Sequence, residues 1–256
     1  MTLKKSLLII ISILLFGACS PKTWQITQAT STKTAIDNTT EVLADSIYTN
    51  HLLPIKQKLD AQMNVVIGIV AETMKGYAPE SLLSNFSADV FHQAGNDFLG
   101  ENVDISIVNM GGLRTVIPAG NITIGKVFEL MPFENELVIL WLKGDKLQDL
   151  IQFFARMGGE GVSGIRMEIQ NGKAINVTVN GKPIDTTKLY TIATSDYLAG
   201  GNDKMIQLAQ NEKRVNTGLK LRNILLDYIK KETAKGNKIE AKLDERIRPL
   251  TPKGEL

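Results

Sequence analysis

Short β-branched runs alternate with amphipathic helical patterns over most of this 256-residue chain, and this alternation limits the fold more than any other feature. Four apolar runs have the length and composition of buried strands, namely 64–71, 103–108, 136–142 and 189–195. Helical spacing of apolar residues predicts helices at 41–63 with an interruption near Pro54, at 79–94 opening with Pro79, at 123–130 with Thr123 as N-cap, at 144–157 and at 218–231. We therefore expect an α/β fold.

The middle of the chain carries an antiparallel signal. Asn171-Gly172 stands between the strand-like segments GIRMEIQ and AINVTVN and predicts a hairpin with a type I′ turn, and a second Asn-Gly pair follows at 180–181. We therefore expect an α+β mixed sheet rather than a purely parallel one. A single domain is expected over 41–256, with its core at about 60–250.

The N-terminus has the pattern of a bacterial lipoprotein signal. Lys4 and Lys5 precede a short apolar segment, and the small residues Gly17 and Ala18 lead into Cys19, the single cysteine of the chain. We expect a signal peptide at 1–18, cleavage before Cys19, and a lipid on its thiol that anchors the protein to a membrane of the bacterial cell envelope, in the periplasm or at the outer membrane. A plain secretory signal with an incidental cysteine is the alternative.

Residues 19–40 are expected to form a flexible tether, because residues 20–40 hold nine Ser or Thr in 21 positions and few apolar side chains.

The charge balance excludes one class of partner. Lys and Arg number 29 and Asp and Glu number 27, so removal of Lys4 and Lys5 leaves 27 of each. A nucleic-acid polymer is therefore not an expected partner, because its binders carry a clustered basic excess.

Three loops that adjoin predicted strands hold polar, aromatic and glycine residues. NMGGLR (109–114) combines two glycines, which allow close approach of the backbone, with an amide and a guanidinium. MPFEN (131–135) places Phe133 before a strand, either as a core residue or as a displayed ring. DYLAGGND (196–203) follows a strand with Tyr197, a glycine pair and Asp203. Taken alone, the first and third loops are more typical of structural turns, and Phe133 is more typical of a core residue.

In this order and spacing, the three loops resemble the C-terminal domain of the 5′-nucleotidase family, which includes the bacterial periplasmic UDP-sugar hydrolases. The family pattern runs N-G-G-G-I-R, then P-F-G, then an aromatic residue followed by G-G-D-G. The segments DISIV, VSGIR and VNGKPIDTTKLYTIATSDYL fit as well, and the resemblance covers about residues 41–250. It implies a single nucleoside-binding domain with the fold of the family's C-terminal domain.

The resemblance also implies roles for individual residues. Phe133 and Tyr197 match two rings that sandwich the base, and Asp203 matches an acid that holds the ribose hydroxyls. Asn109 matches a residue that contacts the base, and Arg114 matches an arginine on the ribose or phosphate side of the substrate. The implied substrate-binding set is Asn109, Gly111, Gly112, Arg114, Phe133, Tyr197 and Asp203.

The chain departs from the family pattern at several positions. Met110 replaces the first glycine of the triplet, Glu134 replaces the glycine after Phe133, and Asn202-Asp203-Lys204 stands in place of G-D-G. The family arginine ahead of the helix at 79–94 has only Tyr77 and Lys75 near its place. This departure points to weaker phosphate binding or to a different ligand.

Catalysis in the family belongs to a separate metallophosphatase domain with two metals held by Asp, Asn and His. Neither D-x-H nor G-N-H-[DE] occurs in this sequence, and His51 and His92 stand apart. We therefore expect no catalytic residue, no metal and no cofactor in this chain, with divalent metals only in a partner. The predicted function is nucleotide recognition in concert with a separate dimetal phosphatase chain. The alternative is a stand-alone lipoprotein that binds nucleosides or nucleotides for capture or uptake.

Overall fold

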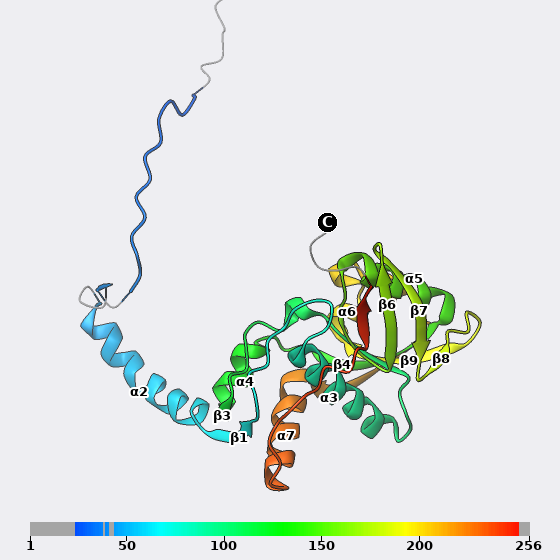
Figure 1. Cartoon of the computed structure of the whole chain (residues 1–256). Coiled ribbons are helices and arrows are strands. Elements are labelled where there is room, and N and C mark those ends of the chain that lie inside the picture. The colour runs from blue at the N-terminus through cyan, green and yellow to red at the C-terminus, as the bar shows by residue number, and fades with distance from the viewer. Residues whose placement is uncertain (1–23, 38, 41–43, 251–256) are drawn as a thin grey trace, which may run out of the picture. The chain divides into compact units, whose positions relative to one another are not determined.

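The computed structural model describes residues 24–37, 39–40 and 44–250, and the chain divides into two units, 1–52 and 53–256 (Figure 1). The predicted signal peptide and Cys19 lie outside the described residues, as does part of the predicted tether. The described side chains of the first unit are almost all exposed. No helix among the described residues has both the length and the apolarity needed to cross a membrane.

Helix α2 (Ser46–Met63) runs through Pro54 without a break, so the interruption expected at this residue is wrong. A proline removes one backbone donor from the helical ladder, and here the turns on both sides continue in spite of that loss. None of the side chains of α2 is buried, and the apolar Ile55 and Leu59 are exposed.

A five-stranded sheet forms the centre of the second unit. Its strands lie in the order β10 (Lys213–Lys220), β4 (Glu136–Lys143), β9 (Leu189–Ser195), β2 (Ile105–Val108) and β5 (Gly161–Ser163). Only β2 and β9 run parallel, and the other neighbours are antiparallel. The mixed α/β architecture expected from the sequence is therefore confirmed.

The sheet is buried on both faces, which explains the unbroken apolar run of β4. Leu137 and Ile139 belong to one hydrophobic cluster, and Val138 and Leu140 belong to another, as expected when successive side chains of a strand point to opposite faces. The first cluster packs under α3 (Leu82–Leu99), α4 (Ile124–Leu130) and α7 (Leu221–Ala234), and the second under α5 (Gly144–Met157).

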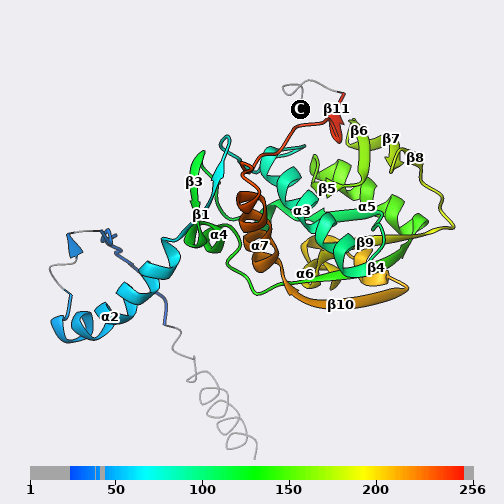
Figure 2. The ribbon, with the colours of Figure 1, turned by 90° about the horizontal axis from the view of Figure 1, so that it is seen from below.

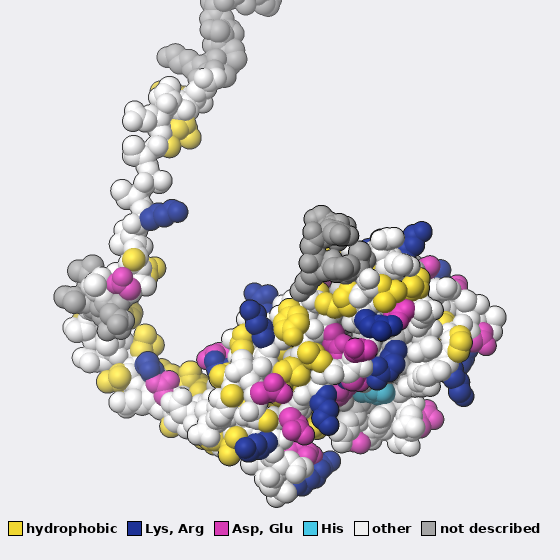
Figure 3. Space-filling model, in the orientation of Figure 1, with side chains coloured by type: hydrophobic (Ala, Val, Ile, Leu, Met, Phe, Trp, Pro, Cys, Tyr) yellow, Lys and Arg dark blue, Asp and Glu magenta, His cyan; other side chains and the backbone are white. Residues whose placement is uncertain are grey.

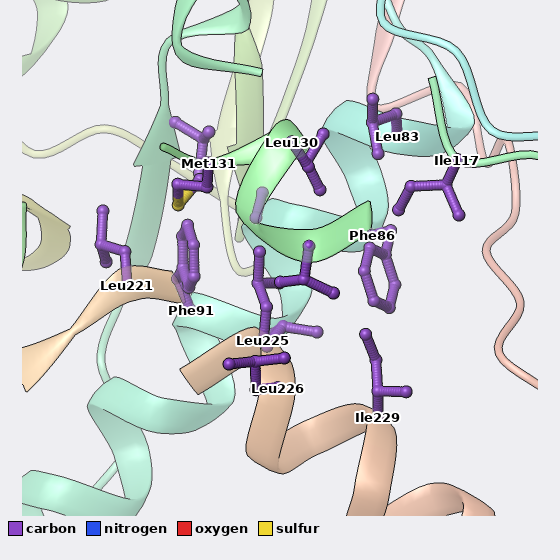
Figure 4. Packing of buried hydrophobic residues seen from close by; sticks show 14 of the residues in the cluster. Leu83, Phe86, Phe91, Ile117, Leu130, Met131, Leu221, Leu225, Leu226 and Ile229 are labelled. Carbon is purple, nitrogen blue, oxygen red and sulfur yellow. The ribbon is translucent and has the colours of Figure 1, made fainter. Parts of the chain in front are cut away.

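Figure 4 shows the first of these clusters, in which Phe91 of α3 lies beside Met131 and Leu221. Helices α3 and α7 also lie side by side in both ribbon views (Figures 1 and 2). Met131 and Leu221 therefore both pack on α3, and this contact fixes the position of the 131–135 loop that is described below.

A second sheet has the order β11 (Ile247–Pro249), β6 (Ile165–Gln170), β7 (Lys173–Val179) and β8 (Lys182–Pro183). Its hairpin turns contain the predicted Asn-Gly pairs, and Asn171 and Gly172 have φ values of 50° and 70°, as a type I′ turn requires. Strands β1 (Val66–Val70) and β3 (Gly120–Thr123) form a small third sheet. Thr123 caps α4 as predicted, by accepting the amide of Lys126.

Two helix boundaries differ from the prediction. α3 begins at Leu82 rather than at Pro79, because Ser81 and Ser84 form a reciprocal capping box. The helix expected from residue 218 begins at Leu221, because residues 213–220 form β10. This strand is polar and lies at the edge of the sheet (Figure 2), where an apolar face is not required. Figure 3 shows side chains of both charge signs interspersed on the surface, consistent with the balanced composition.

Candidate functional site

The three loops singled out from the sequence meet at one edge of the five-stranded sheet. Strands β2 and β9 are parallel and adjacent, so the loops after Val108 and after Ser195 leave the same edge. Strand β4 is antiparallel to β9, with Leu137 opposite Ser195, so the segment before β4 arrives at this edge too. The sheet topology thereby gathers residues that are up to 94 positions apart in the chain.

The converging loops enclose a cavity of about 370 Å³, which lies within the usual size range of small-molecule sites. All seven residues of the predicted substrate-binding set line this cavity, and the structure adds Asn135 to them. Phe133 and Tyr197 are 45% and 40% exposed, so neither ring is a core residue. Their role in binding stays a prediction, but the structure brings the whole set together.

Asp203 is the polar centre of the cavity wall. Its Oδ2 accepts a hydrogen bond from Nδ2 of Asn109 at 2.6 Å, and its Oδ1 accepts one from the hydroxyl of Tyr197 at 2.8 Å. The bond to Asp203 raises the pKa of the Tyr197 phenol, because it is stronger while the hydroxyl keeps its proton. Each carboxylate oxygen retains further lone-pair capacity, so Asp203 can accept additional hydroxyl donors.

The backbone at Asp203 and Lys204 is left-handed, with φ values of 53° and 64°. Glycine adopts this conformation without a steric cost, whereas a lysine does so at about 1–2 kcal/mol. The departure from G-D-G at Lys204 therefore retains the turn at the cost of local strain. The turn is also fixed by Asn202, whose Nδ2 donates to the carbonyl of Tyr197 at 2.7 Å.

Because Gly112 has no side chain, the side chain of Asn109 can lie against it and point at Asp203. A Cβ at Gly112 would lie 2.7 Å from Oδ1 of Asn109, which is closer than real Cβ contacts, whereas a Cβ at Gly111 would meet open space. Of the pair, only Gly112 is therefore needed for Asn109 to keep its observed orientation.

Arg222, a buried residue in the first turn of α7, hydrogen-bonds to the segment that carries Phe133. Its Nη1 donates to the carbonyls of Met131 and Phe133 at 3.4 and 3.3 Å, and its Nη2 pairs with the carboxylate of Glu134. That ion pair lowers the pKa of Glu134. The glutamate that replaces the family's glycine therefore has a structural partner in Arg222.

Arg114 contributes an exposed guanidinium to the cavity. Its Cζ lies 6.0 Å from the centroid of the Phe133 ring, and its Nη1 donates to the carbonyl of Gly111 at 3.2 Å. Neither Tyr77 nor Lys75 is among the residues that line the cavity. Among the described residues that line the cavity, Arg114 is thus the one with a positive charge, and most of its N–H donors are open to a ligand.

Three residues with a place at the site were missed by the sequence analysis, namely Asn135, Glu160 and Arg222. Asn135 had a signal, since it ends the MPFEN segment. Glu160 precedes β5, a strand of three residues that is too short to predict from periodicity. Arg222 lies next to the 131–134 segment because β10 pairs with β4, with Lys220 opposite Glu136, and leads directly into α7.

Within the described parts of the chain, no group of three or more His, Cys, Asp or Glu side chains is arranged to hold a metal ion. His51 is exposed on α2. His92 lies on α3, where its ring nitrogens are 3.0 Å from Oγ of Ser163 and 2.6 Å from the carbonyl oxygen of Val103.

The fold agrees with the comparisons to known proteins. The family described as "5′-nucleotidase, C-terminal domain" matches residues 61–210, more than half of the sequence, so the chain belongs to this family. Protein UshA of Yersinia enterocolitica is 29% identical over 82% of this chain and 39% of its own length. A 5′-nucleotidase of Vibrio vulnificus is 26% identical over 75% of this chain and 36% of its own length.

Among solved structures, the 5′-nucleotidase precursor of Thermus thermophilus superposes with a TM-score of 0.67 and 28% identity, covering 81% of this chain and 44% of that protein. The NAD nucleotidase of Haemophilus influenzae shares the fold, with a TM-score of 0.58 and 24% identity over 80% of this chain and 41% of its own length. The chain therefore spans less than half the length of these relatives.

Proposed function

We propose that this chain binds nucleosides or nucleotides in the cavity and supplies the substrate-recognition part of a 5′-nucleotidase-type hydrolase. One observation carries the proposal. Two half-exposed rings, Phe133 and Tyr197, line the same cavity as a carboxylate that is already oriented by Asn109 and by the Tyr197 hydroxyl.

The chemistry of these groups suits a nucleoside. An aromatic ring stacks on any base, because every base has a π-face, and such stacking tolerates different bases. Asp203 can accept the two ribose hydroxyls, since charged acceptors form the stronger hydrogen bonds. Arg114 can donate to a phosphate or to sugar oxygens through its forked guanidinium. Different residues of the cavity would thus bind the base, the sugar and the phosphate.

Phosphate hydrolysis would come from a second chain that holds two divalent metals. The matched segments make up 39% and 36% of the two curated relatives, and the remainder of each has room for such a metal-holding part. The purified chain alone should not hydrolyse AMP with Mn²⁺, Zn²⁺ or Co²⁺. Mixing it with a metallophosphatase partner should raise the partner's kcat/KM for nucleotides, because substrate orientation contributes several kcal/mol in such reactions. Turnover by the pure chain would contradict this division.

Binding can be tested by calorimetric titration of adenosine, adenine and AMP. Adenosine and AMP should bind, and Asp203→Ala should weaken the binding of adenosine more than the binding of adenine, because adenine has no ribose hydroxyls to donate to this carboxylate. Asp149→Ala, an exposed carboxylate of α5, is the matched control. No binding of any nucleoside or nucleotide at millimolar concentration would contradict the proposal. Binding without stimulation of any phosphatase would favour capture or uptake by a stand-alone protein.

We also propose that the mature protein is anchored in the cell envelope through a lipid on Cys19. The support is sequence-based: a basic start, a short apolar segment and the single cysteine directly after two small residues. Residues 24–37 are exposed and contain no helix or strand, as a tether would require.

A further inference from the structure

Glu160 lies directly behind the loop that carries Asn109, yet it is not among the residues that line the cavity. Its Oε1 accepts hydrogen bonds from the amide of Met110 at 2.7 Å and from the amide of Gly161 at 3.2 Å. The sheet register accounts for this placement, because β5 is antiparallel to β2 with Gly161 opposite Val108. The residue before β5 therefore meets the residues that follow β2.

A short series of hydrogen bonds connects this carboxyl to the cavity. Glu160 holds the backbone at Met110, the adjacent Asn109 donates to Asp203, and Asp203 accepts from Tyr197. We propose that Glu160 is a positioning residue of the cavity: its carboxyl holds the 109–112 loop through the amide of Met110 and thereby keeps Asn109 directed at Asp203. The effect on ligand binding rests on the proposed function, whereas the contact between Glu160 and Met110 does not depend on it.

The protonation of Glu160 falls in an accessible pH range. Partial burial, together with the negative charge of Asp203, raises the pKa of Glu160 to about 7, although the two amide hydrogen bonds oppose the increase. An ionised carboxylate is a stronger acceptor for an amide than a protonated one. The hold on Met110 should therefore strengthen as the pH rises through about 7.

Other ionisable side chains lie on the segments packed around Glu160, namely Asp203, Glu80, His92 and Arg246. Asp203 acts on Glu160 through its charge. Glu80 accepts from Asn85 and from the amide of Asp244, and Arg246 is paired with Asp89 and Asp244. His92 is engaged by Ser163 and Val103. Because His92 contacts the strand that follows Glu160, a variant at this position must accompany the test.

The expected pH dependence of binding has a definite sign. A nucleoside whose hydroxyls donate to Asp203 offsets part of the charge that disfavours ionisation of Glu160. Binding should therefore lower the pKa of Glu160, and by linkage the affinity should rise with pH through about 7. Adenosine is the suitable probe, because it has no group that titrates between about pH 6 and about pH 8.5, so the dependence reports on the protein.

The experiment compares adenosine affinity and amide chemical shifts across this pH range in the full chain and in three variants. Glu160→Ala should weaken binding about tenfold, because Met110 loses its acceptor. Glu160→Gln keeps an acceptor oxygen, so it should restore most of the affinity while abolishing the rise with pH. Glu129→Gln, an exposed carboxyl of α4, and His92→Gln should keep the wild-type pH profile.

The nuclear magnetic resonance measurement separates this inference from the proposed function. In the ligand-free protein, the Met110 amide and the Asn109 side-chain amide should shift with a midpoint near pH 7, and the shift should vanish in Glu160→Gln. If adenosine does not bind at all, the proposed function fails while this titration still decides the positioning role. An unchanged titration in Glu160→Gln, or wild-type affinity in Glu160→Ala, would overturn the inference.

Discussion

At the scale of single residues, the two glycines of the 109–112 loop should differ sharply in their tolerance of a methyl group. Gly112→Ala would place a Cβ against Oδ1 of Asn109 and turn this side chain away from Asp203. Nucleoside affinity should fall about tenfold, as expected for the loss of one hydrogen bond to a charged group. Gly111→Ala is the matched control, because its Cβ would enter open space. Equal losses in both variants would mean that the contact with Asn109 is not the reason for the glycine.

A second residue-scale prediction concerns stability. The pKa of Glu160 is about 7 in the folded chain and has its ordinary value of 4.5 when the chain is unfolded. The folded state thus holds the proton more strongly, and its extra stability is complete below pH 4.5 and is lost as the pH rises to about 7. This loss amounts to at most about 3 kcal/mol. Denaturant unfolding should show a flatter pH dependence for Glu160→Gln than for the wild type, and an identical slope would contradict the assignment.

At the scale of secondary-structure elements, the first turn of α7 supports the segment that displays Phe133. Arg222→Ala removes the donor for two carbonyls of this segment and the partner of Glu134. The free energy of unfolding should fall by about 1–3 kcal/mol, and nucleoside affinity should fall with it. Arg214→Ala, an exposed arginine on β10, should change neither. Loss of stability without loss of affinity would show that α7 supports the fold and not the ring.

The elements also show how far sequence reasoning reaches. The strand at 136–142 was predictable because burial on both faces leaves a continuous apolar run. The helix at 144–157 was predictable because burial of one face leaves apolar residues at helical spacing. The strands β3, β5, β10 and β11 left no such pattern, since they are short or polar and owe their pairing to distant partners. The site followed the same rule. Its lining could be predicted from motifs that adjoin strong strands, whereas Glu160 and Arg222 arrive through β5 and β10.

At the scale of the whole molecule, the N-terminus should determine where the protein is found. Cys19→Ser removes the thiol that a lipid would require, so the protein should leave the membrane fraction or persist as an uncleaved precursor. Cell fractionation with a mass measurement of the product would distinguish these outcomes from the wild type. A mature-sized product that remains bound to the membrane would contradict lipid attachment at this residue.

The central claim is that the cavity of the second unit is a nucleoside site built around two rings, and one paired measurement tests it most directly. Adenosine affinity and thermal stability are determined together for the wild type, Phe133→Ala and Tyr197→Ala. Each substitution should weaken binding about tenfold or more, through loss of stacking on the base, and barely change the melting temperature, because both rings are about half exposed. A Phe133→Ala protein that binds adenosine normally but loses about 3–5 kcal/mol of stability, as a buried phenylalanine would, contradicts the account.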